Sequence, residues 1–408
     1  YIVEHSGTEV LLIDPELKED LADINVKHLF VLGKESDHLF ENTNTPKTWT
    51  PDENATATIN YTSGTTARPK GVEMTHRNLW LNAAIFGWQT GVDHREVYLH
   101  TLPMFHCNGW GMPYAITGMG GKHIVLRKVD GSEILKRIKE HHVTLLCGAP
   151  AVIASILEAA NEWEGEIPGT GTMRIVVAGA PPPTKTIERV ETELGWEFIQ
   201  IYGLTETAPF VTMNRTRPEW DSKTAQERAV LLSSAGSPAL GIGVSTSPDG
   251  ELLVRGNHVL KSYWEQPEAT EQALADGWFH TGDGATLGRD HYVTITDRKK
   301  DVIISGGENI SSIEVEDVLF SHPSVAEVAV IGVPDEKWGE TVKALVVLSE
   351  NELTDEQTLI SYCRENLAHY KCPTSVDFLE ELARTTTGKL QKFKLREPYW
   401  KDMNRQIN

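Results

Sequence analysis

Short apolar runs alternate with polar stretches along much of the chain. Such runs are typical of strands buried in a parallel sheet, and the polar stretches between them have helical periodicity. One predicted helix begins near residues 74–80 with Thr75 as its N-cap, and others cover residues 132–141 and 184–194. The pattern therefore predicts an α/β fold. The predicted strands lie at residues 10–14, 28–33, 124–126, 145–147, 175–178 and 198–202, and the segment 98–110 is predicted to begin as a strand and continue as a loop.

The pattern changes from about Ala235 onward. Short β-type runs separated by turns such as Pro248-Asp-Gly250 predict a small antiparallel barrel within residues 235–299. A different unit follows, and we place the domain boundary near Lys300, which gives domains 1–299 and 300–408. The second domain is predicted to be α+β, with helices at 311–321 and 354–367 and strands at 325–333 and 342–348.

Composition narrows the class of protein. A chain of 408 residues is too long for one compact core, and 40% hydrophobic with 24% charged residues is typical of a soluble globular protein. The net charge of −20 argues against a nucleic-acid partner. Four scattered cysteines favour a reduced, cytoplasmic setting, and no apolar run predicts a membrane span. The first segment reads as the middle of a domain, so we expect the chain to be incomplete at its N-terminus.

Candidate chemistry concentrates in residues Tyr61–Gly71, which combine glycines, hydroxyl side chains and the cations Arg68 and Lys70. Small residues and hydroxyls allow close approach of an anion, so the loop is a candidate for polyphosphate binding. It is not a Walker A loop, because Pro69 and Gly71 flank the lysine. An exposed turn is the alternative. The helix expected from Thr75 would add its dipole to the site if it pointed toward the loop.

Five loops occur in a diagnostic order. They are Tyr61–Gly71, Pro103–His106, Tyr202–Thr207, His280–Asp283 with Asp297-Arg298, and Arg384–Lys389. Together they closely resemble the AMP-forming acyl-CoA synthetases of the adenylate-forming superfamily, over residues 61–398. The resemblance implies a large layered α/β adenylation domain, here partial, with a small β-barrel subdomain, and a small mobile α+β C-terminal domain.

The resemblance also implies a two-step reaction. A carboxylate attacks the α-phosphate of ATP and releases pyrophosphate, and the thiol of coenzyme A then displaces AMP. The implied ligands are ATP, Mg²⁺, coenzyme A and a small carboxylic acid, and a homodimer is compatible with the family. After the first step, the C-terminal domain is expected to rotate and to withdraw its lysine.

The resemblance assigns roles to individual residues. Catalysis falls to Lys389, Thr205, Glu206 and His106, with Glu206 also holding Mg²⁺. ATP or AMP binding falls to Thr62, Ser63, Gly64, Thr65, Thr66, Lys70, Gly179, Ala180, Pro181, Tyr202, Gly203, Asp283 and Arg298. Lys300 is the implied hinge, Ser305, Gly306, Gly307 and Glu308 form the CoA half-site, and His106, Trp110 and Gly203 border the acyl pocket. Judged one at a time, Lys389 would be a solvated lysine and Glu206 a solvated loop carboxylate.

The acid itself is predicted from one position. Acetate-activating members of the family have a tryptophan where this chain has Gly203, and glycine would leave an acyl tunnel open. Medium- or long-chain fatty acids are therefore the first expectation, since each buried CH₂ contributes ~0.8 kcal/mol. Aromatic acids are the second. The remaining alternatives are an adenylating enzyme that loads a carrier protein and a non-catalytic binding module.

Overall fold

The computed structural model describes residues 1–21, 23–33, 36–41, 52–62, 69–385 and 389–401. A seven-stranded sheet with the order β11-β10-β9-β8-β7-β5-β6 forms its centre. The five strands β9 to β6 run parallel, whereas β10 and β11 are antiparallel additions. The strand bounds are β5 Val97–His100, β6 Lys122–Val125, β7 Leu145–Gly148, β8 Arg174–Val177, β9 Glu197–Gly203, β10 Phe210–Arg215 and β11 Ser237–Pro238. The predicted parallel sheet is confirmed.

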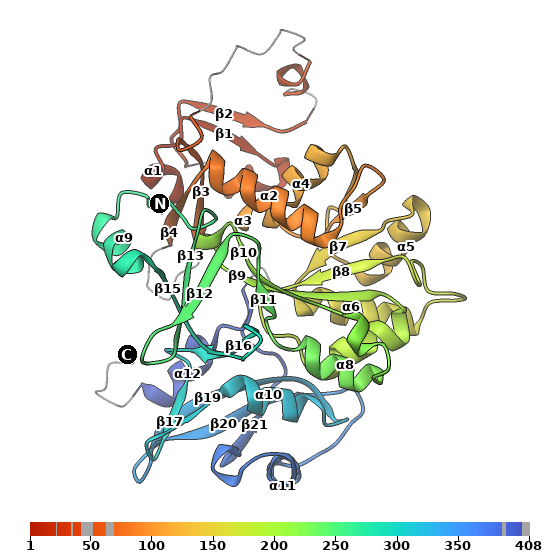
Figure 1. Cartoon of the computed structure of the whole chain (residues 1–408), viewed down its shortest axis with the longest axis vertical. Helices are drawn as coiled ribbons and strands as arrows, with labels where there is room; N and C mark the ends of the chain where they lie inside the picture. The colour runs from red at the N-terminus through yellow and green to blue at the C-terminus, as the bar shows by residue number, and fades with distance from the viewer. Residues whose placement is uncertain (22, 34–35, 42–51, 63–68, 386–388, 402–408) are drawn as a thin grey trace.

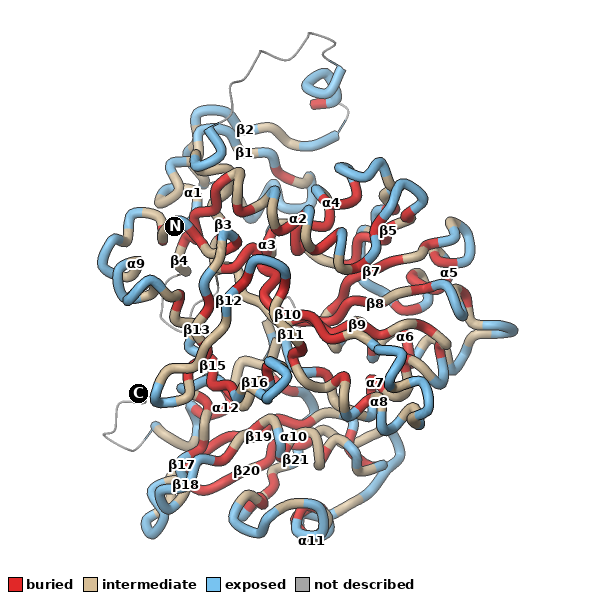
Figure 2. The backbone as a smooth tube through the Cα atoms, viewed as in Figure 1, coloured by how far each residue is buried: buried red, intermediate tan, exposed pale blue. Residues whose placement is uncertain are grey.

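Helices cover both faces of this sheet (Figure 1). Alternate side chains of the strands enter two separate cores, one shared with α2 and the other with α5, α6 and α7. Figure 2 shows the strands between these layers as buried. The helix bounds are α2 His76–Thr90, α4 Met112–Met119, α5 Gly131–His141, α6 Pro150–Asn161, α7 Thr184–Arg189, a π-helical continuation Val190–Leu194, and α8 Ala225–Leu232.

Thr75 caps α2 as predicted. Its hydroxyl accepts from the backbone N–H of Asn78, and the Asn78 side chain accepts from the N–H of Thr75. However, β4 (Lys70–Thr75) separates this helix from the candidate phosphate loop, which joins β4 to β3 (Thr56–Thr62). Six residues of strand span roughly 20 Å. The expectation that the helix dipole adds to the loop is therefore wrong.

A four-stranded antiparallel sheet follows, with the order β12-β13-β15-β16. It forms a half-barrel within residues 235–299, where the sequence predicts a small antiparallel barrel. The short strand β14 (Ser262–Tyr263) of the same range pairs with β4 instead. The other bounds are β12 Ile242–Thr246, β13 Glu251–Gly256, β15 Phe279–Leu287, β16 Val293–Arg298 and α9 Pro267–Ala273.

The C-terminal unit has its own sheet and its own core. Its sheet has the order β18-β17-β20-β19, with β21 beside β20. We propose the domain boundary between Val293 and Ile303, where one set of core clusters ends and the next begins. The bounds are β17 Ile303–Ser305, β18 Glu308–Ile310, α10 Ser312–Phe320, β19 Val325–Asp335, β20 Gly339–Leu348, α11 Glu356–Asn366, β21 Ser375–Phe378 and α12 Lys392–Trp400.

The first strand pair departs from the sequence prediction. β1 (Val10–Ile13) and β2 (His28–Val31) pair in parallel as a separate two-stranded sheet. The sequence predicts buried strands here, yet Val10 and Leu12 are about half exposed. Apolar composition predicts burial only where a covering layer is present. The remaining short helices are α1 Ile2–His5, α3 Cys107–Trp110, and 3-10 turns at Pro15–Leu17, Asp37–Leu39, Thr205–Thr207, Pro218–Trp220, Ala275–Gly277 and His369–Lys371.

Candidate active site

Lys389 reaches from the C-terminal domain to the carboxyl edge of the central sheet. Its Cε lies 3.4 Å from where a Cβ would stand at Gly179, the second residue after β8. Burial lowers the pKa of Lys389, and the charge of Arg298 lowers it further, while Asp283 and Glu206 act in the opposite direction. The structure thus brings the lysine together with three residues that the sequence assigns to the nucleotide site.

Glu206 lies in the 3-10 turn Thr205–Thr207 that follows β9. The hydroxyl of Tyr263 donates to its Oε1 at 2.9 Å, and the ammonium of Lys70 lies 4.7 Å from the centre of the Tyr263 ring. Burial raises the pKa of Glu206. A half-buried carboxylate that keeps free lone pairs fits a magnesium ion held mainly by phosphate oxygens and water. Among the described residues, no group of three or more potential ligand side chains forms a metal cage by itself.

Asp283 and Tyr202 form a hydrogen-bonded pair beside Lys389. The Tyr202 hydroxyl donates to Oδ2 of Asp283 at 2.7 Å, and the Arg298 guanidinium lies 3.6 Å from Oδ1. The antiparallel register of β15 and β16 places Asp283 directly opposite Arg298. Burial raises the pKa of Asp283, and the Arg298 charge opposes that rise. The predicted ribose ligand and the predicted adenine-side tyrosine are therefore neighbours, with an arginine able to support both.

The loop that carries His106 contains an unusual backbone turn. Cys107, Asn108, Gly109, Trp110 and Gly111 all have φ between 48° and 78°, the left-handed region. This conformation costs non-glycine residues roughly 1–2 kcal/mol each, so the surroundings must impose it.

Side-chain contacts hold this turn in place. The amide of Asn108 exchanges hydrogen bonds with the amide of Asn60 at 3.1 and 3.2 Å. The carbonyl of Trp110 accepts from Asn82 at 3.2 Å. Cys107 places its Sγ 3.1 Å from the Thr205 hydroxyl, which joins this turn to the 3-10 turn Thr205–Thr207.

His106 immediately precedes this turn and is half-buried. Burial and the nearby charge of Lys389 lower the pKa of His106 to about 4, so its imidazole is neutral at pH 7. Trp110 is 4% exposed and its side chain belongs to the main core. Its predicted place in an acyl pocket stays a prediction.

Gly203 requires a correction. It pairs with Phe210 across β9 and β10, and a Cβ atom added there would overlap the carbonyl oxygen of Pro209. Glycine is needed because two backbones approach closely, so its presence says nothing about an open acyl tunnel. The expectation that a tryptophan would simply fill a tunnel at this position is wrong for this backbone.

The structure describes the two ends of the candidate phosphate loop. Ser63, Gly64, Thr65 and Thr66 lie outside the described residues. Thr62 and Lys70 are paired at the end of the β3–β4 pair, so the two ends of the loop lie side by side. Gly179, Ala180 and Pro181 are exposed after β8, on the side where Lys389 enters.

The predicted hinge and CoA half-site occupy the start of the C-terminal domain. The carbonyl of Lys300 accepts from Arg396 of α12 at 2.8 Å. Ser305, Gly306, Gly307 and Glu308 form the tight turn of the β17–β18 hairpin, and both glycines have positive φ. Among the contacts of the described residues, this turn meets Trp338 and Gly339 of its own domain and is not joined to the Lys389 cluster.

Several residues of the site have no signal in the local sequence. Tyr263 supports Glu206, Cys107 contacts Thr205, and Asn60 holds the strained turn, yet each partner is distant along the chain. An aromatic residue or an asparagine in isolation predicts none of these contacts. α12 was also missed, because Pro398 lies inside it and proline usually ends a helix.

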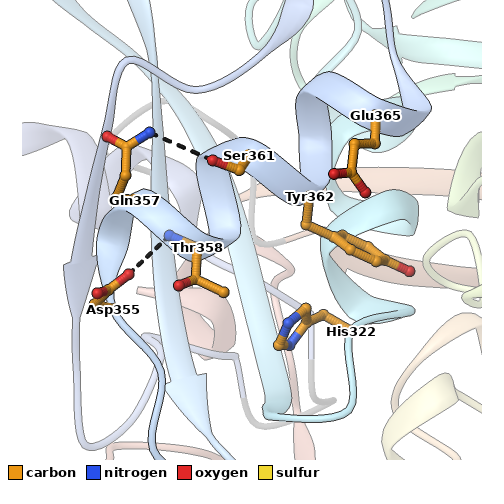
Figure 3. A pocket seen from close by; sticks show the side chains of 7 residues that line it. All are labelled: His322, Asp355, Gln357, Thr358, Ser361, Tyr362 and Glu365. Atoms are coloured by element: carbon orange, nitrogen blue, oxygen red, sulfur yellow. Dashed lines mark hydrogen bonds between the residues drawn. The ribbon is translucent and has the colours of Figure 1, made fainter.

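A separate surface pocket lies on the C-terminal domain, around α11 (Figure 3). The rings of His322 and Tyr362 meet edge to face there, 5.0 Å apart. No residue predicted from the sequence lines this pocket. The described helices include none that is both long and apolar enough to cross a membrane.

A two-domain architecture with a lysine of the C-terminal domain inserted near a glutamate, an aspartate and an arginine is the arrangement that the resemblance to the adenylate-forming superfamily implies. A family model described as AMP-binding enzyme matches residues 1–264, and one described as AMP-binding enzyme C-terminal domain matches residues 314–389. The chain belongs to this family.

Relatives and solved structures agree with that assignment. The chain is 44% identical to a 2-methylpropanoate–CoA ligase of Humulus lupulus and 40% identical to a peroxisomal benzoate–CoA ligase of Arabidopsis thaliana. These matches cover 83% and 85% of this chain, which spans 63% of the length of each relative. The ATP-bound structure of MatB from Rhodopseudomonas palustris is 28% identical, with a TM-score of 0.86 over 99% of this chain and 82% of that one.

Proposed function

We propose that this chain activates a carboxylic acid with ATP and transfers the acyl group to the thiol of coenzyme A. The observation that carries the proposal is the insertion of Lys389 at Gly179, where its charge interacts with those of Glu206, Asp283 and Arg298. A positioned cation next to acidic ligand-binding groups suits a reaction between two anions, the carboxylate and the α-phosphate.

Each residue of the site would have a role that fits the chemistry of its side chain. Asp283 would accept from the vicinal hydroxyls of ribose, with Arg298 beside it. Lys70 and the loop before it would hold the outer phosphates, and Glu206 would hold Mg²⁺, which neutralises phosphate charge when bound. Lys389 would stabilise the charge that develops as the carboxylate oxygen bonds to phosphorus and pyrophosphate leaves. In the second step, the thiol sulfur bonds to the acyl carbon and AMP leaves with the electron pair.

We propose a short branched or aromatic acid as the substrate rather than a long fatty acid. Gly203 no longer supports an open tunnel, because its backbone contact with Pro209 accounts for the glycine. Two relatives carry names that specify 2-methylpropanoate and benzoate, a short branched acid and an aromatic acid. The setting of the enzyme stays a prediction, since one of these relatives is named peroxisomal whereas the cysteine pattern favours the cytoplasm.

An acid-dependent ATP–pyrophosphate exchange screen tests this proposal. We expect exchange with 2-methylpropanoate, butyrate or benzoate, and at least tenfold weaker exchange with octanoate and palmitate. The same acids should yield CoA thioesters. Exchange without thioester, combined with acylation of an apo-carrier protein, would favour the carrier-loading alternative, and no exchange with any acid would overturn the proposal.

The lowered pKa of Lys389 predicts a pH dependence. The ammonium is the active form, and a lowered pKa means that the proton is lost at a lower pH than in an ordinary lysine, near 10.4. We therefore expect kcat/KM for ATP in the exchange reaction to fall on an alkaline limb centred below pH 10.4, since this parameter reports the free enzyme. The variant Lys389→Arg should lack that limb, because guanidinium keeps its proton. An unchanged limb in this variant would assign the titration to another group.

A further inference from the structure

α10 of the C-terminal domain is tied to the N-terminal domain by a carboxylate. Asp317 in α10 accepts two hydrogen bonds from Thr184, one from its backbone N–H at 2.8 Å and one from its hydroxyl at 2.9 Å. Thr184 is the first residue of α7, just after the loop that carries Gly179. N–H groups in the first turn of a helix lack partners within the helix, so this contact supplies one from the other domain.

A second contact, at the start of the same helix, also joins it to the N-terminal domain. Asp297 of β16 is 3% exposed and accepts from the backbone N–H and the hydroxyl of Ser312, at 2.8 and 2.6 Å. The Ser311 hydroxyl donates to the carbonyl of Thr296. Both acceptors precede Lys300 in the chain, and both donors follow it.

The anchoring of the hinge shows which contacts a rotation would break. Arg396 is buried and donates to the carbonyls of Lys300 and Asp301, at 2.8 and 3.1 Å. The carbonyl of Lys300 belongs to the rigid peptide plane that continues into Asp301. Arg396 therefore fixes that peptide plane to the C-terminal domain. While this contact holds, a rotation of the C-terminal domain must occur about backbone bonds that precede the plane in the chain. Such a rotation separates Asp297 from Ser312 and Asp317 from Thr184.

We infer that the Asp317–Thr184 pair is a latch that holds the C-terminal domain in the adenylating orientation, with Asp297–Ser312 as its second point of attachment. Asp317 is a positioning residue, because its contact lies on α7 rather than among the groups around Lys389. The inference rests on the proposed function, since an orientation matters only if the two half-reactions need different ones.

The variant Asp317→Asn tests the latch. It keeps the size of the side chain, but removes the charge and one of the two acceptors that face Thr184. We expect adenylate formation, measured in a single turnover as pyrophosphate release, to slow by roughly tenfold, which is the size of effect that charge-assisted hydrogen bonds give. Thioester formation from supplied acyl-adenylate and CoA should stay the same or become faster. Glu314→Gln is the matched control, because Glu314 lies on the same helix and pairs with Lys371 of the same domain.

Hydrogen exchange gives a readout that does not depend on activity. The N–H of Thr184 should exchange faster in Asp317→Asn and stay protected in Glu314→Gln, without any ligand. Thr184→Val should reproduce part of the kinetic effect, and Thr184→Ser should restore it. Equal slowing of both half-reactions, or unchanged exchange at Thr184, would overturn the latch. A wild-type chain that releases no pyrophosphate with any acid would overturn the proposed function instead, while the exchange result would still decide whether the contact exists in solution.

Discussion

Replacing Lys389 with methionine is expected to slow adenylate formation by about 100- to 1,000-fold, the usual consequence of removing one preorganised charge donor from a developing anion. Methionine matches the length of the lysine stem but has no charge. The measurement is acid-dependent pyrophosphate release in a single turnover. Thioester formation from supplied acyl-adenylate and CoA should remain within about threefold of wild type, because the lysine is expected to have withdrawn by then.

Lys394→Met provides the matched control for this prediction. Lys394 is exposed on α12, five residues after Lys389, and lies 6.0 Å from the Phe393 ring. Its loss should leave both half-reactions unchanged. If Lys389→Met slowed both half-reactions equally while the protein remained folded, Lys389 would serve both steps in one orientation, and the two-orientation mechanism would be wrong.

Replacing Gly203 with alanine is expected to abolish both half-reactions and to lower the free energy of unfolding by on the order of 4 kcal/mol, the range of exceptionally disruptive substitutions. The added Cβ overlaps the Pro209 carbonyl oxygen, so β9 and β10 must separate where they present Thr205 and Glu206. Backbone cannot rotate away as a flexible side chain can. Denaturant unfolding and pyrophosphate exchange measure the two consequences.

Gly243→Ala is the control for this substitution. Gly243 also lies in a strand, β12, but its added Cβ would meet its nearest neighbour at 3.6 Å, which is ordinary contact. It should cost less than about 1 kcal/mol, as expected for a surface substitution away from special features. A stable Gly203→Ala protein with altered acid preference would contradict the backbone argument and would return Gly203 to the acyl pocket.

A backbone turn in the left-handed region lies next to the candidate active site. The left-handed turn from Cys107 to Gly111 is held by Asn60 and Asn82, and it carries the thiol that contacts Thr205. Burial raises the pKa of Cys107 to about 11, so this cysteine is a neutral thiol at pH 7. A neutral, buried thiol is a poor nucleophile, so we assign Cys107 the structural role of contacting Thr205.

The sequence by itself determined the kind and order of most helices and strands, and it identified the loops that carry the candidate site residues. Apolar periodicity predicted the parallel strands and the helices 132–141 and 184–194, because side-chain burial repeats over a few residues. The Thr75 cap followed from the same local rules. The resemblance of five ordered loops then named Lys389, Glu206 and Asp283 together, although no spacing along the chain predicts that they meet.

Tertiary structure alone decided the contacts that assemble the site. Strand register set Asp283 against Arg298, the domain orientation brought Lys389 to Gly179, and the fold joined Tyr263 to Glu206. Tertiary structure also explains why the sequence predictions for Gly203 and for the burial of β1 were wrong. The carbonyl of Pro209 explains Gly203, and the absence of a covering layer among the described residues leaves β1 exposed. The physical reason is the sequence separation over which each effect acts. Periodicity and capping depend on residues a few positions apart, whereas close backbone approach and burial depend on segments that are distant in sequence.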